Sequence, residues 1–133
     1  MELTKNMSYI KKIAMILVAA ALLIFLSGIF VIYLEVRSTC KAAMEKFGGS
    51  CQSALIAVLE DPSVAPKEKN DAIWALGQMA DPTSLPALEK IWSGKVPEGR
   101  EPLDEVVSQY EIEKAMRWMK QGNITSWMYG GLK

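Results

Sequence analysis

The sequence contains no histidine, and this absence removes at once the commonest general base and the commonest metal ligand. Its two cysteines are too few for a disulfide-rich scaffold or a zinc site. It also lacks a glycine-rich phosphate loop, a Ser/His/Asp or Cys/His set, and a Cys-x-x-Cys-His haem-attachment motif. We therefore expect no enzymatic activity, no metal, no cofactor and no small-molecule substrate.

An excess of positive charge is missing as well. Lysine plus arginine balance aspartate plus glutamate at 15 each in the 133 residues. Residues 35–133 carry 12 basic and 14 acidic side chains, a net charge of −2. Because nucleic-acid binding depends on basic side chains that neutralise phosphates, we expect no nucleic-acid partner.

One long stretch has no charged residue. Residues 13–34 comprise 22 residues, of which 14 are leucine, isoleucine, valine or phenylalanine. At 1.5 Å per residue a helix of this length covers about 33 Å, enough to cross a hydrocarbon core of about 30 Å. A cleaved signal peptide is the alternative, but the run exceeds the usual apolar length and no small-residue cleavage site precedes Glu35. We predict a single-pass transmembrane helix in the lipid bilayer, after a short polar tail at residues 1–12.

The charged residues that flank this helix hardly favour one orientation over the other. Three lysines precede the run, and three basic residues lie within the 12 residues that follow it, namely Arg37, Lys41 and Lys46, so the positive-inside count is tied. Lys11 and Lys12 lie closest to the boundary, which favours a cytoplasmic amino terminus and an outer or periplasmic position for residues 35–133. Small residues on one face allow close approach of a second membrane helix, with simple lipid exposure as the alternative. The candidates for such packing are Ala20, Ala21, Ser27 and Gly28.

The strongest helical pattern after the apolar run lies in residues 70–92. A first helix is marked by apolar residues at helical spacing, namely Ala72, Ile73, Ala75, Leu76, Met79 and Ala80. Asp81-Pro82 ends it, because proline cannot donate a backbone hydrogen bond. Thr83 or Ser84 can cap a second helix, whose apolar stripe is Leu85, Leu88, Ile91 and Trp92. Helices this short are not stable alone, so we expect each to bury its stripe on the other and on neighbours.

This pair resembles a HEAT-like repeat of the kind grouped with the phycobilisome lyase repeats. The resemblance rests on an alanine-rich first helix with Ala-Leu-Gly, the Asp-Pro turn, and Leu-Pro-Ala-Leu at residues 85–88. The sequence departs from the pattern at Ala80, where the family has glycine, and near Asn70, where a basic residue is expected. The resemblance implies a helical solenoid that serves as an interaction scaffold.

We predict about two and a half such repeats in residues 35–133. Their ranges are 35–60, 66–93 and 102–133. In the first, Gly48-Gly49 ends a helix at Phe47 and Ser50 caps the next. The third repeat aligns with the second at a shift of 43 residues, which places Ala72 on Ala115 and lies within the 40–47 residues typical of HEAT repeats. Residues 103–110 are expected to be helical, and either this helix breaks near Ser108-Gln109 or it continues as one long helix packed on both sides. Residues 125–130 are expected to form the last helix.

The predicted stack is shorter than the three or more repeats that solenoids usually need. It either closes its ends with Trp118, Trp127 and the membrane surface, or leaves an apolar face for a partner.

The two cysteines, Cys40 and Cys51, lie on either side of the Gly48-Gly49 turn. An oxidising compartment would permit a disulfide between them. If the first helix runs to Phe47, a tight turn leaves Cys40 about 9 Å too far along the helix axis, so a bridge requires the helix to end early or bend. A disulfide and two separate buried thiols both remain open, whereas the spacing excludes a Cys-x-x-Cys redox pair.

Trp74 is the strongest candidate for contact with a partner. On a helical wheel it lies on the polar side of its helix, with Asn70 and Gln78 nearby, and large aromatic residues at solvent-facing positions often anchor interfaces. The alternative is that a neighbouring helix covers Trp74. The candidate contact set is therefore Trp74, Asn70 and Gln78.

The sequence as a whole predicts an all-α protein, in which a single N-terminal transmembrane helix precedes a short HEAT-like α-solenoid of antiparallel helix pairs. We expect a membrane-anchored docking or scaffolding module whose partner is another protein, itself membrane-associated. Two other functions remain open. One is a small accessory subunit of a larger membrane complex, held by the transmembrane helix. The other is a membrane-tethered maturation factor like the lyase-type relatives.

Overall fold

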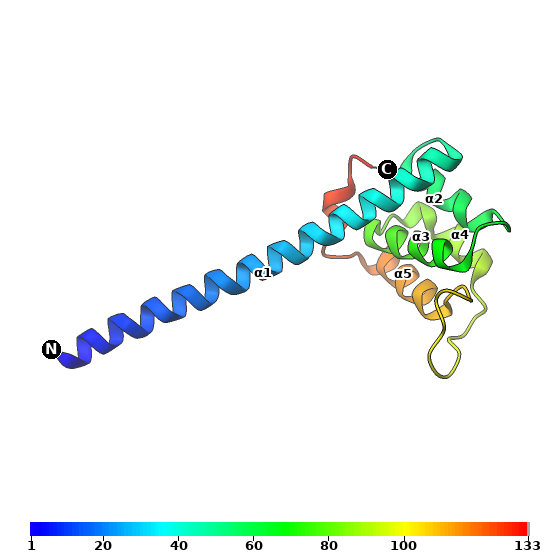
Figure 1. The fold of residues 1–133 in the computed structure, drawn as a ribbon. Helices are drawn as coiled ribbons and strands as arrows, with labels where there is room; N and C mark the ends of the chain where they lie inside the picture. The colour runs from blue at the N-terminus through cyan, green and yellow to red at the C-terminus, as the bar shows by residue number, and fades with distance from the viewer. Residues whose placement is uncertain (133) are drawn as a thin grey trace. The chain divides into compact units, whose positions relative to one another are not determined.

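The computed structural model describes residues 1–132 and confirms the all-α class, because every regular element within these residues is a helix (Figure 1). Lys133, the last residue of the predicted third repeat, lies outside the described residues. The elements in chain order are α1 (Glu2–Phe47), α2 (Cys51–Glu60), α3 (Pro66–Met79), the short 3-10 helix η1 (Pro82–Ser84), α4 (Leu85–Ile91), α5 (Gln109–Gln121) and the 3-10 helix η2 (Ser126–Tyr129).

The chain divides into two units at the residue where the apolar run ends. The first unit is Met1–Leu34, and the second begins at Glu35. The predicted polar tail at residues 1–12 is part of α1, since no proline or glycine interrupts it. By length and composition, α1 contains a segment that could cross a membrane, although a signal sequence near the amino terminus meets the same criterion.

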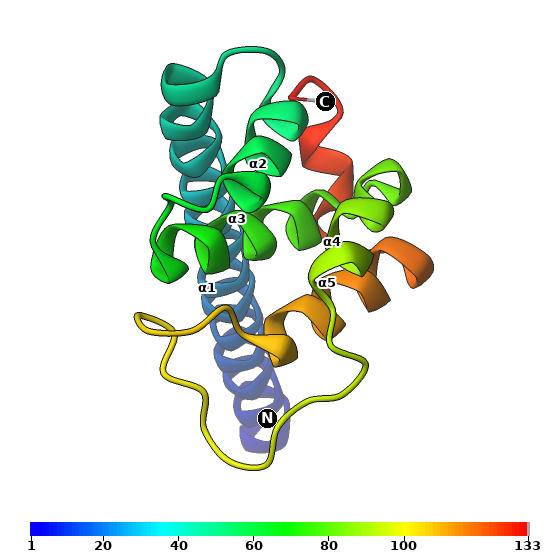
Figure 2. The same cartoon turned by 90° about the vertical axis from the view of Figure 1, so that its right-hand side faces the viewer.

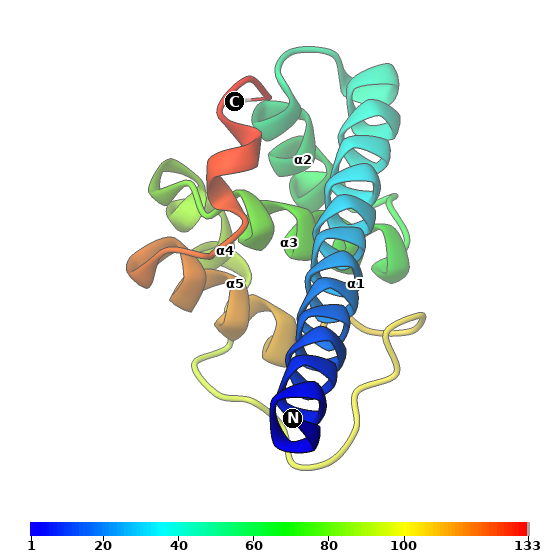
Figure 3. The same ribbon diagram turned by 90° about the vertical axis from the view of Figure 1, so that its left-hand side faces the viewer.

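α3 is the central helix of the second unit. Figures 2 and 3 show it between α2 and α5, against which it packs most extensively, and it also contacts η2. Its buried residues are Asn70, Ala72, Ile73, Ala75, Leu76, Gly77, Gln78 and Met79. An amphipathic surface helix buries one stripe, whereas α3 is buried around most of its circumference. The core of the unit is therefore built around α3.

Small residues allow α5 to approach α3 closely. A Cβ atom built on Gly77 would lie 2.9 Å from the Cβ of Ala115 and 3.1 Å from Cε3 of Trp118. Both separations are shorter than ordinary carbon–carbon contacts. Gly77 therefore sets the spacing between the two helices.

The expected pairing of α3 with α4 needs correction. α4 follows α3 across the Asp81-Pro82 turn, but it packs mainly against α5 and η1. Leu88 is fully buried, while the rest of the predicted stripe is half-buried, namely Leu85, Ile91 and Trp92. A helix of seven residues offers too little surface to cover α3, which packs on α2 and α5 instead.

The turn after α3 also differs from expectation at its cap. Ala80 has φ 47°, a left-handed conformation that glycine adopts more easily. Asp81 caps η1 with its side chain, whereas Ser84 stands at the N-cap of α4 without a side-chain capping bond. One oxygen of Asp81 accepts from the backbone N–H of Thr83 at 3.0 Å and from its hydroxyl at 2.7 Å. The hydroxyl of Ser84 instead accepts from Nε2 of Gln52 at 2.7 Å, which links the turn to α2.

Two side chains fix the start of α5. The predicted helix is absent over residues 103–108, and α5 begins at Gln109, where the sequence allowed a break. The hydroxyl of Ser108 caps α5, and the carboxylate of Glu101 accepts from the backbone N–H groups of Gln109 at 2.9 Å and Tyr110 at 3.0 Å. Acceptors at the first N–H groups of a helix define where it starts.

Glu101 is held in its charged form. Burial raises the pKa of this carboxyl, but hydrogen bonds from Tyr110, Gln109 and Ser108 together outweigh burial and hold the pKa below its ordinary value. A lowered pKa contributes stability at neutral pH, and this contribution is lost as the pH falls through the lowered value.

The last helical element, at the end of the predicted third repeat, is a single 3-10 turn. The predicted helix over residues 125–130 is η2, in which Tyr129 is fully buried and Trp127 is 76% exposed. The core is therefore filled here by Tyr129 and not by Trp127. Trp118 on α5 is half-buried.

The contact at Gly77 provides a test of the fold. In a helix, replacing glycine by alanine ordinarily raises stability by about 1 kcal/mol. We expect Gly77→Ala to lower the free energy of unfolding by about 1–3 kcal/mol instead, because the added methyl group has no room against Ala115 and Trp118. Urea denaturation of the full chain in detergent, followed by tryptophan fluorescence, measures the change.

Gly130→Ala is the matched control, because nothing lies within 4 Å of a Cβ atom built there. We expect this variant to stay within about 0.5 kcal/mol of the parent. A Gly77→Ala variant as stable as the parent would contradict the close packing of α3 on α5.

Candidate docking groove

The last part of α1, residues 35–47, belongs to the second unit and connects to α2 through three residues. Gly48 and Gly49 end α1 with φ values of 71° and 77°. The hydroxyl of Ser50 caps α2 by accepting from the backbone N–H of Ser53 at 3.3 Å. Both features confirm the predicted break and cap.

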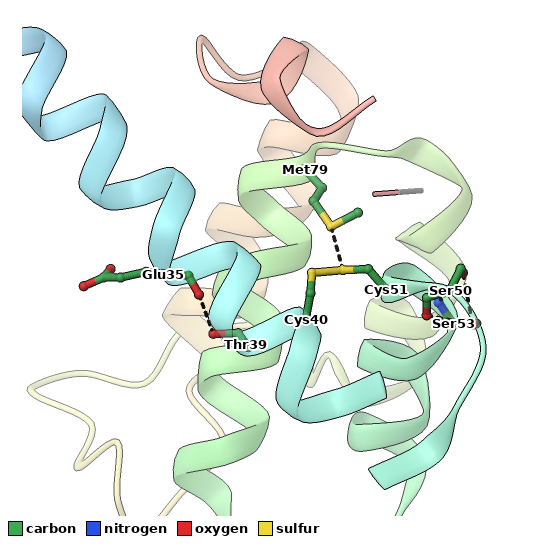
Figure 4. Close-up of a disulfide and its surroundings, with 7 residues drawn as sticks. All are labelled: Glu35, Thr39, Cys40, Ser50, Cys51, Ser53 and Met79. Carbon is green, nitrogen blue, oxygen red and sulfur yellow. Dashed lines mark hydrogen bonds between the residues drawn. A yellow bond between two sulfur atoms is a disulfide. The ribbon is translucent and has the colours of Figure 1, made fainter. Parts of the chain in front are cut away.

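Cys40 and Cys51 form a disulfide, and their Cα atoms lie 4.9 Å apart (Figure 4). The expectation that a bridge requires α1 to end early or bend is wrong, since α1 runs to Phe47. The connector has four Cα–Cα steps and can span up to about 14 Å. It runs back along α1 rather than turning tightly, and so it brings Cys51 level with Cys40.

The disulfide joins α1 to α2 and packs against α3. Cys40 and Cys51 are each 2% exposed, and Sδ of Met79 on α3 lies 3.7 Å from Sγ of Cys51 (Figure 4). A disulfide sulfur carries no hydrogen, so this approach is a packing contact between α2 and α3. Val36 and Ala43 of α1 are buried as well. The covalent link therefore holds α1 in place over α2 and α3.

A groove with a volume of about 240 Å³ opens between these three helices. Its apolar lining is made of small and branched residues, namely Ala42 and Ala43 of α1, Leu55 and Val58 of α2, and Ala72 of α3. Lys46, Glu68 and Asp71 add charges to the same lining. The groove therefore offers an apolar floor with charged groups of both signs.

Two exposed ion pairs border the groove. Nζ of Lys46 lies 3.7 Å from Oε2 of Glu68, and Nζ of Lys67 lies 3.0 Å from Oδ2 of Asp71. The hydrogen bond to Asp71 and its charge raise the pKa of Lys67. Exposed pairs of this kind contribute little to stability, so their charges are free to exchange partners.

The groove continues along α1 toward the start of the second unit. A neighbouring hollow is lined by Glu35, Ser38 and Thr39 of α1 and by Asp71 and Trp74 of α3. Ser38, Thr39 and Asp71 line both hollows. Trp74 is half-buried at this end: part of its side chain packs against the protein, and part is exposed to solvent.

Asn70 and Gln78 are not surface groups, and their burial is at odds with the predicted partner contact. Asn70 is 4% exposed and Gln78 is 6% exposed. Nδ2 of Asn70 donates to the carbonyl groups of Leu103 and Val106, each at 2.8 Å. Oδ1 of Asn70 accepts from the backbone N–H of Ser108 at 2.8 Å. A polar position on a helical wheel becomes interior when a returning loop satisfies its hydrogen bonds.

Gln78 likewise bonds a returning segment of the chain at the other end of α3. Its Oε1 accepts from the hydroxyl of Thr125 at 2.8 Å and from Nδ2 of Asn123 at 3.1 Å. It thereby holds the segment that leads into η2. Of the three predicted contact residues, Trp74 is the one that lines the hollow beside the groove.

The residues predicted to pack against another membrane helix lie in the first unit. All four are exposed: Ala20, Ala21, Ser27 and Gly28. The hydroxyl of Ser27 donates to the carbonyl of Leu23 at 2.7 Å, within the same helix. Nothing lies within 4 Å of a Cβ atom built on Gly28. Packing of this face against a second helix stays a prediction.

Comparison with known families agrees with the position of the helical pair. A model of the PBS lyase HEAT-like repeat matches residues 69–91, from within α3 to the end of α4. These residues are similar to a HEAT-like repeat, a class of structure associated with protein interaction. A search of curated proteins and a search of solved structures each found no match. Among the side chains that the structure describes, no group of three or more histidine, cysteine or acidic residues could hold a metal ion.

The disulfide can be tested by removing both sulfur atoms. We expect the double variant Cys40→Ser, Cys51→Ser to lose about 2–3 kcal/mol of unfolding free energy, because the unfolded chain is no longer cross-linked. Denaturation of the full chain in detergent measures the loss. The parent with its bridge reduced is the control and should show a similar loss.

A thiol assay on the parent, purified from an oxidising compartment and then denatured, should detect no free thiol. Two free thiols, or a double variant as stable as the oxidised parent, would contradict the bridge.

Proposed function

We propose that this protein is a membrane-tethered docking module without catalytic activity of its own. The groove between α1, α2 and α3 would receive an apolar side chain from another membrane protein. The partner's contact segment would be the stretch that follows its own exit from the bilayer. The observation that carries the proposal is that the groove begins within a few residues of the end of the apolar run.

The distance from the membrane supports this choice of partner segment. Ser38 and Lys46 lie 4 and 12 residues beyond Leu34, which corresponds to about 6 Å and 18 Å along a helix. If α1 crosses the bilayer, the groove lies within about 20 Å of its surface. A segment that leaves the same bilayer reaches this height without a long linker.

The size of the groove favours a protein side chain over a small molecule. Its volume of about 240 Å³ is below the roughly 300–1,000 Å³ of typical ligand pockets. Its floor is made of Ala42, Ala43 and Ala72 with two branched residues, and small side chains of this kind allow another backbone to come close. Lys46, Glu68 and Asp71 can pair with charges that flank the inserted side chain.

A second candidate function draws on the first unit. The open face at Gly28 would suit a small accessory subunit that is held in a larger complex by α1 itself. A third candidate, a lyase-like maturation factor, rests on the resemblance of residues 69–91 alone.

Filling the groove tests the proposal. Ala42 is exposed at the groove, so Ala42→Trp should block it without disturbing the core. We expect the amount of co-purifying membrane protein to fall at least about tenfold in mild detergent, the effect of losing one strong contact. Quantitative mass spectrometry of the purified full chain gives the readout.

Met44→Trp is the matched control, since Met44 is exposed on α1 but does not line the groove. This variant should keep the partner, and both variants should keep the disulfide. Equal recovery with both variants would refute docking in the groove. Loss of the partner on Gly28→Leu, with retention on Ala42→Trp, would support the accessory-subunit function instead.

A further inference from the structure

Two large apolar side chains near η2 point away from the core. Ile124 is 74% exposed and Trp127 is 76% exposed. Among the described residues of the second unit, no other large apolar side chain is more than half exposed. Tryptophan and isoleucine are costly to leave in water, so this pair requires an explanation.

The pair is held in place by buried contacts. Tyr129 is fully buried, and Thr125 between the two exposed residues is 4% exposed. The hydroxyl of Thr125 donates to Oε1 of Gln78 at 2.8 Å, which fixes the segment to α3. Ile124 and Trp127 are therefore presented by an anchored turn.

The anchoring residue places this turn near the start of the second unit. Gln78 lies one helical turn, or about 6 Å, from Trp74 along α3. Trp74 lines a hollow together with Glu35, the first charged residue after the apolar run. The exposed pair is thus connected, through α3, to the residue at which the chain would leave a bilayer.

Basic side chains lead up to the exposed pair along α5, and one acidic residue, Glu113, lines a hollow together with Arg117 and Lys120. No acidic residue follows Glu113 in the sequence. Lys114 is paired with Glu111 at 2.6 Å, which leaves Arg117 and Lys120 exposed in the last turns of α5, just before the segment that leads to η2. Basic side chains near apolar ones are the combination that anionic lipid surfaces attract.

We infer that Ile124 and Trp127 insert into the headgroup region of an anionic bilayer, with Arg117 and Lys120 facing lipid phosphates. Tryptophan is enriched at this depth because its ring is apolar and its N–H can still find a polar partner. This contact holds the second unit against the membrane beside its anchor. The inference rests on the proposed membrane anchoring by α1, and it concerns a different surface from the groove.

Fluorescence quenching tests the contact in the full chain. The protein is reconstituted in vesicles of phosphatidylcholine and phosphatidylglycerol, with and without bromine on the acyl chains. We expect bromine to quench the parent, and Trp127→Phe to lose about half or more of that quenching, because Trp127 is the most exposed of four tryptophans. Replacing phosphatidylglycerol with phosphatidylcholine should weaken the quenching.

Trp92→Phe is the control, since Trp92 is half-buried on another helix. This variant should keep most of the quenching. Unchanged quenching in Trp127→Phe, in vesicles that retain the protein during flotation after alkaline carbonate treatment, would overturn the inference and leave anchoring intact. If a co-purifying protein covered Trp127 instead of lipid, Trp127→Phe would also leave the quenching unchanged, and the inference would be overturned. Release of the protein by carbonate would overturn anchoring and, with it, the inference.

Discussion

The close approach of α5 to α3 is the constraint on which the rest of the second unit depends. Gly77 leaves no room for a side chain against Ala115, and so α5 covers a face of α3 that its sequence would leave in water. The loops on either side of α5 then reach the two polar residues of α3. Asn70 bonds the loop before α5, and Gln78 bonds the segment after it. α2 packs on another side of α3, and the side of α3 that faces α1 borders the groove.

The way α1 lies over α2 and α3 explains the position of the groove. The last part of α1 is tied over α2 and α3 by the disulfide, which fixes it at Cys40 but does not close the space on both sides of it. Alanines in the lining leave a hollow that larger residues would fill. The first residues that line the groove follow the apolar run in the sequence of α1. In the proposed function, this one helix would both anchor the protein and border the docking groove.

Helix ends that depend on neighbouring residues could be predicted from the sequence, whereas contacts between residues far apart in the chain could not. Glycine pairs, a serine cap and an Asp-Pro turn act within a few residues, so the ends of α1, α2 and α3 could be predicted. The burial of Asn70 and Gln78 depends on loops that lie 30 or more residues away in sequence. The disulfide depended on the path of three connector residues, and a spacing argument that assumed a tight turn left it open. The start of α5 depended on Glu101, whose capping role has no signal in helical periodicity. Trp74 was predicted as a contact residue, and the structure adds the groove that it borders.

The central claim is that a membrane protein occupies this groove in the native membrane. A photo-reactive amino acid at Ala42 tests it most directly, with the same group at Met44 as the reference, because no purification is needed before the bond forms. The account predicts that Ala42 cross-links to one membrane protein, at residues just outside its own transmembrane segment, and that Met44 does not. Cross-links from Ala42 to lipid alone, or equal cross-linking from both positions, would contradict it.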